Sequence, residues 1–312
     1  MKKTDDIRVR ITNFIKTLPK TVSVKAYGSS IAYQSGYKDN EKKQVDLIVI
    51  VDDIKQFYTE NLKMNKYMYK LIPRIYFKRA KSKNLKKAAG ICYTTDIVYG
   101  EDTYKMGVIE KVDALDDLLN WKTFYIAGRF QKEMFTAQAD AEIEKANEIN
   151  KKNAMTIALL LLKKENPTLL DLYEQICSLS YMGDSRKNFK AEDPNKIKKL
   201  GSGSKEHFNK EFRDKSKLIK VSKDEHITVD YKETFESIKR LPDELRKKIE
   251  ENTEGKLDME HIDIIRGSIE EYLTTIIKKS SLGQTKKGIL TTGPKNSLVY
   301  ALRKLKKGRK KD

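Results

Sequence analysis

Hydrophobic residues near the N-terminus follow first a helical spacing and then a strand spacing. From residue 5 to residue 18 they recur every three or four positions, which predicts a helix that ends before Pro19. Residues 22–26 alternate between apolar and polar side chains, as in a strand with one buried face. Residues 45–51 are apolar except for Asp46, and such a continuous run is typical of a strand buried on both faces.

Helical and strand-like segments continue to alternate further along the chain. Residues 54–69 carry apolar side chains at helical spacing, with Asp53 placed to cap this helix. Residues 90–95 and 104–109 are strand-like. This alternation, as far as residue 112, predicts a first domain of α/β or α+β type.

The pattern from residue 113 to about residue 200 is helical. Asp113 is placed to cap a helix that ends near residue 129, and residues 139–164 predict one or two more helices. Thr168 is placed to cap another. We therefore expect the middle of the chain to be a helical domain.

The last third of the chain combines a short hairpin with an amphipathic helix. The apolar segments 218–221 and 227–229 predict the hairpin, and residues 262–276 carry an apolar stripe at helical spacing. The glycines of residues 280–293 predict a loop, and Pro294 is placed at the start of a last short helix.

The composition narrows the classes of partner. The formal net charge of +19 indicates an anionic partner, and nucleic acid, a membrane surface and nucleotide triphosphates all qualify. Two cysteines in apolar segments indicate buried thiols in a reducing compartment, and three scattered histidines argue against a histidine-rich metal site. The longest apolar run, residues 158–162, is far shorter than the ~20 residues of a membrane-spanning helix. The N-terminus has no apolar signal core, so we expect an intracellular protein.

Asp46 is the residue with the clearest chemical implication. A carboxylate inside a buried strand needs a partner, because an unpaired buried charge is costly, and a metal ion is one such partner. The strand before it ends at Gly28, where backbone amides can approach a phosphate closely. Together with Ser29 and Ser30, these residues have the arrangement of a nucleotidyltransferase site for a triphosphate and Mg²⁺. An ordinary strand–turn–strand with one acid at a strand end remains the alternative.

Several short sequences occur in the order found in one family of enzymes. With them, the chain resembles the mitochondrial-type phosphatidate cytidylyltransferases, the CDP-diacylglycerol synthases of the translocator assembly and maintenance type, over roughly residues 20 to 307. The matching segments are residues 27–29 with 34–37, 45–48, 61–65, 105–108, 117–132, 180–186, 192–196 and 280–293.

The resemblance implies an α+β fold in three parts. These are a nucleotidyltransferase domain with a mixed sheet in residues 1–112, a helical winged-helix-like domain in residues 113–240, and a C-terminal helical region in residues 241–312. It implies the transfer of CMP from CTP to phosphatidic acid with Mg²⁺ as cofactor. It places the protein at the cytoplasmic side of an inner membrane, as a peripheral protein without a presequence.

The resemblance also suggests roles for individual residues. Asp46 is expected to bind Mg²⁺, and Lys105 and Arg186 are expected to be catalytic. Nucleotide binding is expected from a set of residues in the first half of the chain: Tyr27, Gly28, Ser29, Ser30, Asn61, Asn65 and Arg129. Spacing alone would place Asn61 and Asn65 on a solvated helix face.

The sequence departs from the usual pattern of two acids on one strand. Ile48 stands where nucleotidyltransferases commonly carry the second acid of an Asp-x-Asp pair. The second metal carboxylate must come from elsewhere, and Asp184 is the first choice, with Glu192 second. Histidines that members of the family carry near positions 58 and 68 are absent here.

The basic C-terminus has two interpretations. A short amphipathic helix surrounded by Lys and Arg can lie on an anionic membrane, as the resemblance implies, or it can be a solvated helix with a lysine tail. The residues expected to contact lipid or membrane are Gln284, Lys287, Leu298, Leu302, Arg303, Lys304 and Leu305.

The rival function is nucleotidyl transfer to RNA or to protein, which the net charge allows. We see no basic surface rich in aromatic residues of the kind that stacks nucleic-acid bases, so no nucleic-acid partner is expected.

Overall fold

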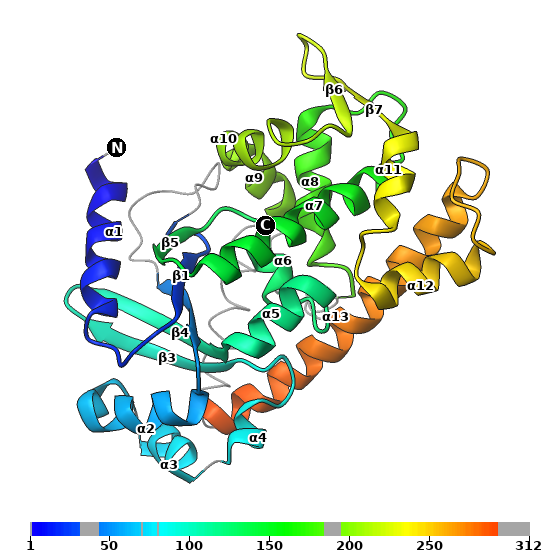
Figure 1. The fold of residues 1–312 in the computed structure, drawn as a ribbon. Helices are drawn as coiled ribbons and strands as arrows, with labels where there is room; N and C mark the ends of the chain where they lie inside the picture. The colour runs from blue at the N-terminus through cyan, green and yellow to red at the C-terminus, as the bar shows by residue number, and fades with distance from the viewer. Residues whose placement is uncertain (1, 32–43, 70, 80, 184–194, 293–312) are drawn as a thin grey trace.

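The computed structural model describes residues 2–31, 44–69, 71–79, 81–183 and 195–292 (Figure 1). Its first part is built on a five-stranded sheet in the order β3-β4-β2-β1-β5. β2 and β4 are parallel, and the other neighbouring pairs are antiparallel. The strands are β1 (Ser23–Tyr27), β2 (Val45–Val51), β3 (Cys92–Tyr99), β4 (Asp102–Glu110) and β5 (Phe135–Gln138).

Strand β2 is buried on both faces beyond Asp46, as its apolar run predicted. Leu47 and Val49 point into a core on one face of the sheet, and Ile48 and Ile50 point into a second core on the other. Successive side chains of a strand point to opposite faces, so from Leu47 to Val51 the side chains of this central strand are buried in one core or the other.

The first of these cores lies under the N-terminal helices. Phe14 of α1 stacks on Tyr104 of β4, and Tyr58 of α2 stacks on Phe77 of α3. The elements on this face are α1 (Lys2–Ile15), α2 (Ile54–Met64), the 3₁₀ turn Lys66–Met68, α3 (Leu71–Arg79) and α4 (Ser82–Leu85). Asp53 caps α2 by accepting a hydrogen bond from the backbone N–H of Gln56 at 2.8 Å, as predicted.

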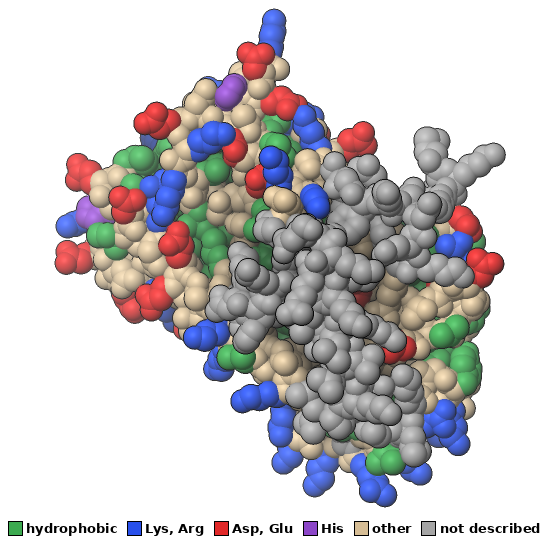
Figure 2. Space-filling model, turned by 180° about the vertical axis from the view of Figure 1, so that it is seen from behind, with side chains coloured by type: hydrophobic (Ala, Val, Ile, Leu, Met, Phe, Trp, Pro, Cys, Tyr) green, Lys and Arg blue, Asp and Glu red, His purple; other side chains and the backbone are tan. Residues whose placement is uncertain are grey.

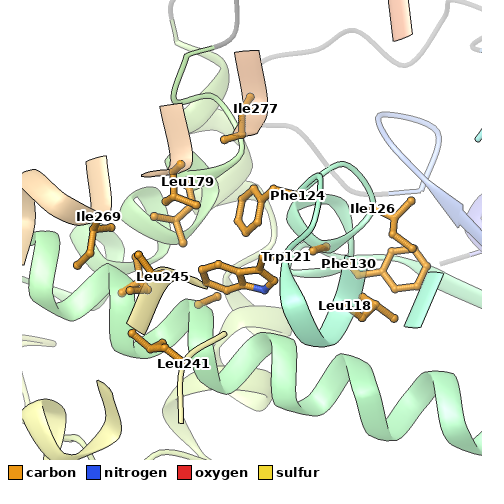
Figure 3. Close-up of a cluster of buried hydrophobic side chains, with 14 of the residues drawn as sticks. Leu118, Trp121, Phe124, Ile126, Phe130, Leu179, Leu241, Leu245, Ile269 and Ile277 are labelled. Carbon is orange, nitrogen blue, oxygen red and sulfur yellow. The ribbon is translucent and has the colours of Figure 1, made fainter. Parts of the chain in front are cut away.

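The second core joins the sheet to later helices. It includes Trp121 and, from the far end of the chain, Ile269 and Ile277 (Figure 3). The helices that contribute are α5 (Lys111–Asn120), α6 (Ala127–Phe130), α7 (Ala141–Leu161), α11 (Tyr231–Ile238), α12 (Asp243–Asn252) and α13 (Ile262–Thr292). Helix α13 crosses the molecule from α12 to the end that carries α3 and α4 (Figure 1).

The chain after the sheet is mainly helical, so the fold class is α+β, as expected. Thr168 begins α8 with a capping box, in which its hydroxyl and the carboxylate of Asp171 bond each other's backbone N–H groups. The predicted hairpin is present as β6 paired with β7. The remaining elements of this region are α8 (Leu169–Leu179), α9 (Lys196–Gly203), α10 (Lys205–Phe208), the π-helical turn Asn209–Arg213, β6 (Ile219–Val221) and β7 (Ile227–Val229).

The prediction of one helix from Asp113 to about residue 129 was wrong in two respects. The helix begins at Lys111, and Asp113 lies in its first turn and does not cap it. The helix also stops at Asn120, because Trp121 adopts a left-handed backbone conformation with φ of 51°. Burial of the indole in the second core holds it there, against the usual preference of non-glycine residues.

The sheet receives its edge strand β5 from residues 135–138, beyond the predicted boundary at residue 112. The division of the chain into three domains stays a prediction.

The predicted loop at residues 280–293 was also wrong, because α13 continues as a helix to Thr292. Its glycines do not break the helix; Gly283 instead lets the helix approach Ala88, whose Cβ would lie 3.0 Å from a Cβ placed on Gly283. No helix among the described residues is both long and apolar enough to cross a membrane.

The buried amide of Asn150 connects α7 to the segment around α6. Its Oδ1 accepts hydrogen bonds from the indole N–H of Trp121 and from Gln131 Nε2, both at 2.9 Å, and its Nδ2 donates to the carbonyl of Ala127.

We predict that Asn150→Ala lowers the free energy of unfolding by about 3 kcal/mol, because it leaves several buried groups unpaired. Asn120→Ala is the control: within the part of the chain that the structure describes, this exposed amide bonds Asp116 on the same helix, and the loss should stay within ~0.5 kcal/mol. Equal losses in urea titrations of the two variants would contradict this account.

Candidate active site

Three neighbouring strands bring Tyr27, Asp46 and Lys105 side by side. Tyr27 of β1 is paired in register with Asp46 of β2, and Asp46 is paired with Lys105 of β4. The Lys105 ammonium nitrogen lies 3.4 Å from Oδ1 of Asp46, and both side chains are partly exposed, at 19% and 29%. The single carboxylate in the apolar run of β2 therefore has a cation beside it.

The turn after β1 fits closely against Asp46. Gly28 has a φ of +85°, and a Cβ placed on it would lie 3.2 Å from Oδ2 of Asp46. A glycine is favoured here both by the backbone conformation and by the contact. The Oγ of Ser30, two residues on, is buried without a hydrogen-bond partner among the described residues. A hydroxyl in that state is suited to bind an oxygen atom of a ligand.

Tyrosines that the sequence analysis did not select surround the cations of this site. The Lys105 ammonium lies 4.5 Å from the ring centroid of Tyr93, whose hydroxyl is 3.4 Å from that of Tyr27. The guanidinium carbon of Arg129 lies 3.9 Å from the ring centroid of Tyr125 and 5.9 Å from that of Tyr27. Cations over aromatic faces are stabilised by the ring quadrupole, so these rings hold Lys105 and Arg129 in place.

Burial favours the neutral form of the phenols of Tyr27 and Tyr93. It raises the pKa of Tyr27 and raises the pKa of Tyr93 well above the ordinary value. For Arg129, burial alone would lower the pKa, but the adjacent tyrosines Tyr125, Tyr93 and Tyr27 hold it well above its usual range. At neutral pH the site thus combines a permanent guanidinium with hydroxyl groups that can donate hydrogen bonds.

Gly107 makes room for the ring of Tyr93. The two residues are paired across β3 and β4, and a Cβ on Gly107 would lie 2.6 Å from Cε1 of Tyr93 and 2.7 Å from Cδ1 of Ile91. In the sequence, the sign that a large side chain packs beside Lys105 was therefore Gly107, two positions further along on the same strand face.

The structure brings together Tyr27, Gly28, Asp46, Lys105 and Arg129, and places Ser29 and Ser30 in the turn that follows Gly28. Three other predicted residues, Asp184, Arg186 and Glu192, lie outside the described residues, as do Leu298, Leu302, Arg303, Lys304 and Leu305.

Asn61 and Asn65 are not part of this cluster. Asn61 lies on α2 and Asn65 ends it, and α2 packs on the opposite face of the sheet from Asp46. Asn65 donates hydrogen bonds to Oδ1 of Asn61 and to the carbonyl of Thr17, both at 2.7 Å, and Asn61 donates to the hydroxyl of Tyr69 at 2.5 Å. Both amides are buried, so they are neither solvated nor available to a nucleotide, and the expectation for them is corrected.

Gln284 and Lys287 do not face a membrane either. Both are buried, at 8% and 4% exposure, and both donate hydrogen bonds to backbone carbonyls of the segment from Leu85 to Ile91. The prediction of lipid contact for these two residues depended on a loop, and it fails because that segment is a helix packed against the protein.

The donor groups of the site are compatible with magnesium. Among the described residues no group of three or more His, Cys, Asp or Glu side chains is placed to hold a metal ion, and Asp46 is the carboxylate that this cluster contributes. Magnesium at a nucleotide site is typically held by one or two carboxylates together with phosphate oxygens and water. Asp46 would supply one such carboxylate.

A polar cavity of about 300 Å³ lies beside the cluster, toward the helical part of the molecule. Lys25 enters it from β1, on the same strand face as Tyr27, and is paired with Glu144 at 2.5 Å. On its other side Lys151 is paired with Glu211 at 2.6 Å. Burial lowers the pKa of His207 in its wall to about 4, so this imidazole is neutral at physiological pH.

The comparisons with known proteins agree on one family. The family model described as phosphatidate cytidylyltransferase, mitochondrial, matches residues 11–307. The phosphatidate cytidylyltransferase of Xenopus laevis is 30% identical, and the match covers 96% of this chain and 93% of that protein. The Caenorhabditis elegans enzyme of the same name is 29% identical over 90% of this chain and 92% of its own length. The Schizosaccharomyces pombe enzyme is 32% identical over 64% of this chain, which is 50% of that protein.

The neutral His207 predicts acid sensitivity of the fold. Because its folded-state pKa of about 4 lies below the ordinary 6.5, the unfolded chain takes up a proton first as the pH falls. Stability is therefore complete above pH ~6.5 and is lost progressively toward pH 4. We expect His207→Gln to remove roughly 2 kcal/mol of the loss between pH 6.5 and 4.5, measured by urea unfolding. Parallel pH profiles for the variant and the unaltered protein would refute the assignment.

Proposed function

The chain belongs to the mitochondrial phosphatidate cytidylyltransferase family, and from this we propose that it transfers CMP from CTP to phosphatidic acid, forming CDP-diacylglycerol and pyrophosphate. The family match over residues 11–307 is the observation that carries the proposal. The cluster around Asp46 supports it, because its turn, carboxylate and cations are the parts that nucleotidyl transfer requires.

The triphosphate of CTP binds at the turn after β1 in this proposal. Gly28 turns the chain at a positive φ directly after β1, and the Oγ of Ser30 lacks a protein partner among the described residues, so phosphate oxygens would be bound at this turn. Ser29 lies between them in the same turn. Lys105 faces this turn across Asp46 and contributes positive charge.

Asp46 would hold magnesium together with the phosphates. When bound, the ion neutralises charge on the phosphoryl oxygens and so stabilises the departing pyrophosphate. Its position beside Gly28 places Asp46 next to the proposed phosphate site. Asp184 is the proposed second carboxylate, with Glu192 as the alternative, and Arg186 is a proposed phosphate ligand.

The reaction needs no strong general base. A phosphate monoester has a second pKa near ~6 and is largely deprotonated at neutral pH. Its oxygen attacks the α-phosphorus of CTP, the bond from that phosphorus to the bridging oxygen breaks, and pyrophosphate leaves with the electron pair. The main requirement is to bring two anions together, and Lys105 and Arg129 reduce their repulsion.

The tyrosines around Arg129 suit the polar part of a substrate. Tyr27 and Tyr93 present neutral hydroxyls, and Tyr125 supports the guanidinium through its ring. We assign Arg129 to substrate phosphate because its charge is independent of pH and its fork can bind two oxygens.

Access to a lipid substrate requires contact with a membrane surface. We propose that the end of the molecule formed by α2, α3 and α4 faces anionic lipid, where Lys and Arg side chains gather at the lower edge of Figure 2. Exposed basic residues of these elements are Lys63, Lys78, Arg79 and Lys83, and Lys66 lies in the 3₁₀ turn between α2 and α3. We also propose that Leu298, Leu302, Arg303, Lys304 and Leu305 contact the membrane, at the cytoplasmic side of an inner membrane.

The winged-helix-like domain proposed for residues 113–240 would include α8, α9 and the β6–β7 hairpin.

The assay that tests the function uses labelled CTP offered with phosphatidic acid in detergent micelles, with RNA, or with no acceptor. Label is expected in lipid, with CTP preferred over ATP and with dependence on magnesium. Incorporation into RNA but not lipid, or equal use of ATP, would reject the proposal in favour of the rival nucleotidyltransferase.

We predict that Asp46→Asn keeps the fold and lowers turnover on the order of 10²-fold or more, because the amide keeps the shape but loses the charge that a metal needs. Asp52→Asn is the matched control, since this exposed carboxylate just beyond the same strand pairs only loosely with Lys20, at 3.4 Å. Turnover and melting temperature are measured for both. Near-normal turnover of Asp46→Asn would remove the metal assignment.

Gly28→Ala separates backbone strain from the contact with Asp46. The substitution adds about 1 kcal/mol of strain at positive φ and also presses on the carboxylate. Gly255→Ala adds similar strain, at a φ of +77°, but a Cβ there meets nothing within 4 Å. We expect similar falls in melting temperature, but a fall in kcat/KM for CTP on the order of tenfold only for Gly28→Ala. The same kcat/KM in both variants would show that the turn does not serve the nucleotide.

A further inference from the structure

The second half of α13 is attached to the segment that leads into β3. Lys287 Nζ donates to the carbonyl of Leu85 and, at 3.0 Å, to that of Lys87. One helical turn earlier, Gln284 Nε2 donates to the carbonyl of Ile91 at 3.0 Å. These contacts join residues about 200 positions apart in the sequence.

The attachment is close and specific. Gly283, beside Gln284 in the sequence, approaches Ala88, which itself has a positive φ of 60°. Lys287 is only 4% exposed, and burial lowers its pKa. A buried ammonium is tolerated only where oxygen atoms replace its water, and here backbone carbonyls do so. A methionine or leucine would fill this position at lower cost if packing alone were needed.

The attached segment determines where Tyr93 lies. Ile91, whose carbonyl Gln284 binds, and Tyr93 are the two side chains that occupy the space over Gly107. The Tyr93 ring lies 4.5 Å from the Lys105 ammonium. A shift of the segment would therefore move the ring that supports Lys105.

We propose that Gln284 and Lys287 are positioning residues: they hold the start of β3 so that Tyr93 keeps Lys105 beside Asp46. The inference rests on the proposed function of that cluster and accounts for the glycine- and lysine-containing sequence 280–288, which the proposed reaction does not otherwise use. Neither residue touches substrate in this account.

The test compares Lys287→Met with Lys286→Met, a control at an exposed neighbouring position of the same helix. We expect Lys287→Met to lower kcat on the order of tenfold with little change in KM for CTP, because Lys105 is displaced while the turn at Gly28 is not. Amide hydrogen exchange of residues 85–93 should also accelerate. Lys286→Met should match the unaltered protein in both measurements.

A double-mutant cycle identifies the route of the effect. If Lys287 acts through the ring of Tyr93, adding Lys287→Met to Tyr93→Leu should lower kcat by much less than it does alone. Multiplicative losses would overturn the inference, and so would an unchanged kcat in a folded Lys287→Met protein. If Lys287→Met fails to fold, Gln284→Leu removes one bond of the same set and is held to the same criteria. If the unaltered protein turns over CTP and these variants have the same kcat, the inference is rejected and the proposed function is not. If the unaltered protein itself is inactive, the proposed function is rejected.

Discussion

The parallel pairing of β2 with β4 is the constraint on which the rest of this structure depends. It sets Asp46 beside Lys105, and the antiparallel neighbour β1 sets Tyr27 on the other side. Parallel neighbours require a crossover, and here residues 52–101 provide it with helices on one face and with the hairpin partner β3. The charged pair is thus placed by strand register, which the cores on both faces of β2 hold against slippage.

The polar groups on the two faces of the sheet differ: those on one face stabilise the fold, and those on the other form the candidate active site. Polar residues toward the N-terminal helices, such as Asn61 and Asn65, bond one another and tie α2 to the segment just after α1. On the opposite face, toward α5 and α13, Asp46 and Lys105 remain partly exposed, and Ser30 has no partner among the described residues. Buried polar groups with complete partners specify a fold, whereas those with spare capacity are suited to bind a ligand.

Much of the fold could be predicted, and the failures have physical causes. Periodicity located β1, β2, β3, β4, the hairpin and the cap of α8, because these depend on local patterning. It missed the break at Trp121, where tertiary burial overrides backbone preference. The prediction of a loop at residues 280–292 was wrong, because a glycine that allows close packing of a helix cannot be distinguished from a turn glycine in the sequence. In the site, Asp46 and Gly28 stood out by residue type, but Tyr93 and Tyr125 are recognised only once the strands are paired.

The distance between Asp46 and Lys105 allows the two opposite charges to stabilise each other before a ligand binds. At 3.4 Å and with partial exposure, the pair is close enough for each charge to offset the desolvation of the other. It is not a tight bidentate pair, and an ammonium on a flexible stem can turn toward a phosphate oxygen without leaving the field of Asp46. The ring of Tyr93 supplies a second, weaker attraction that limits how far Lys105 can swing. A carboxylate with a movable cation on one side and a glycine turn on the other is therefore both paired and accessible, which is the combination that a metal-dependent phosphoryl site requires.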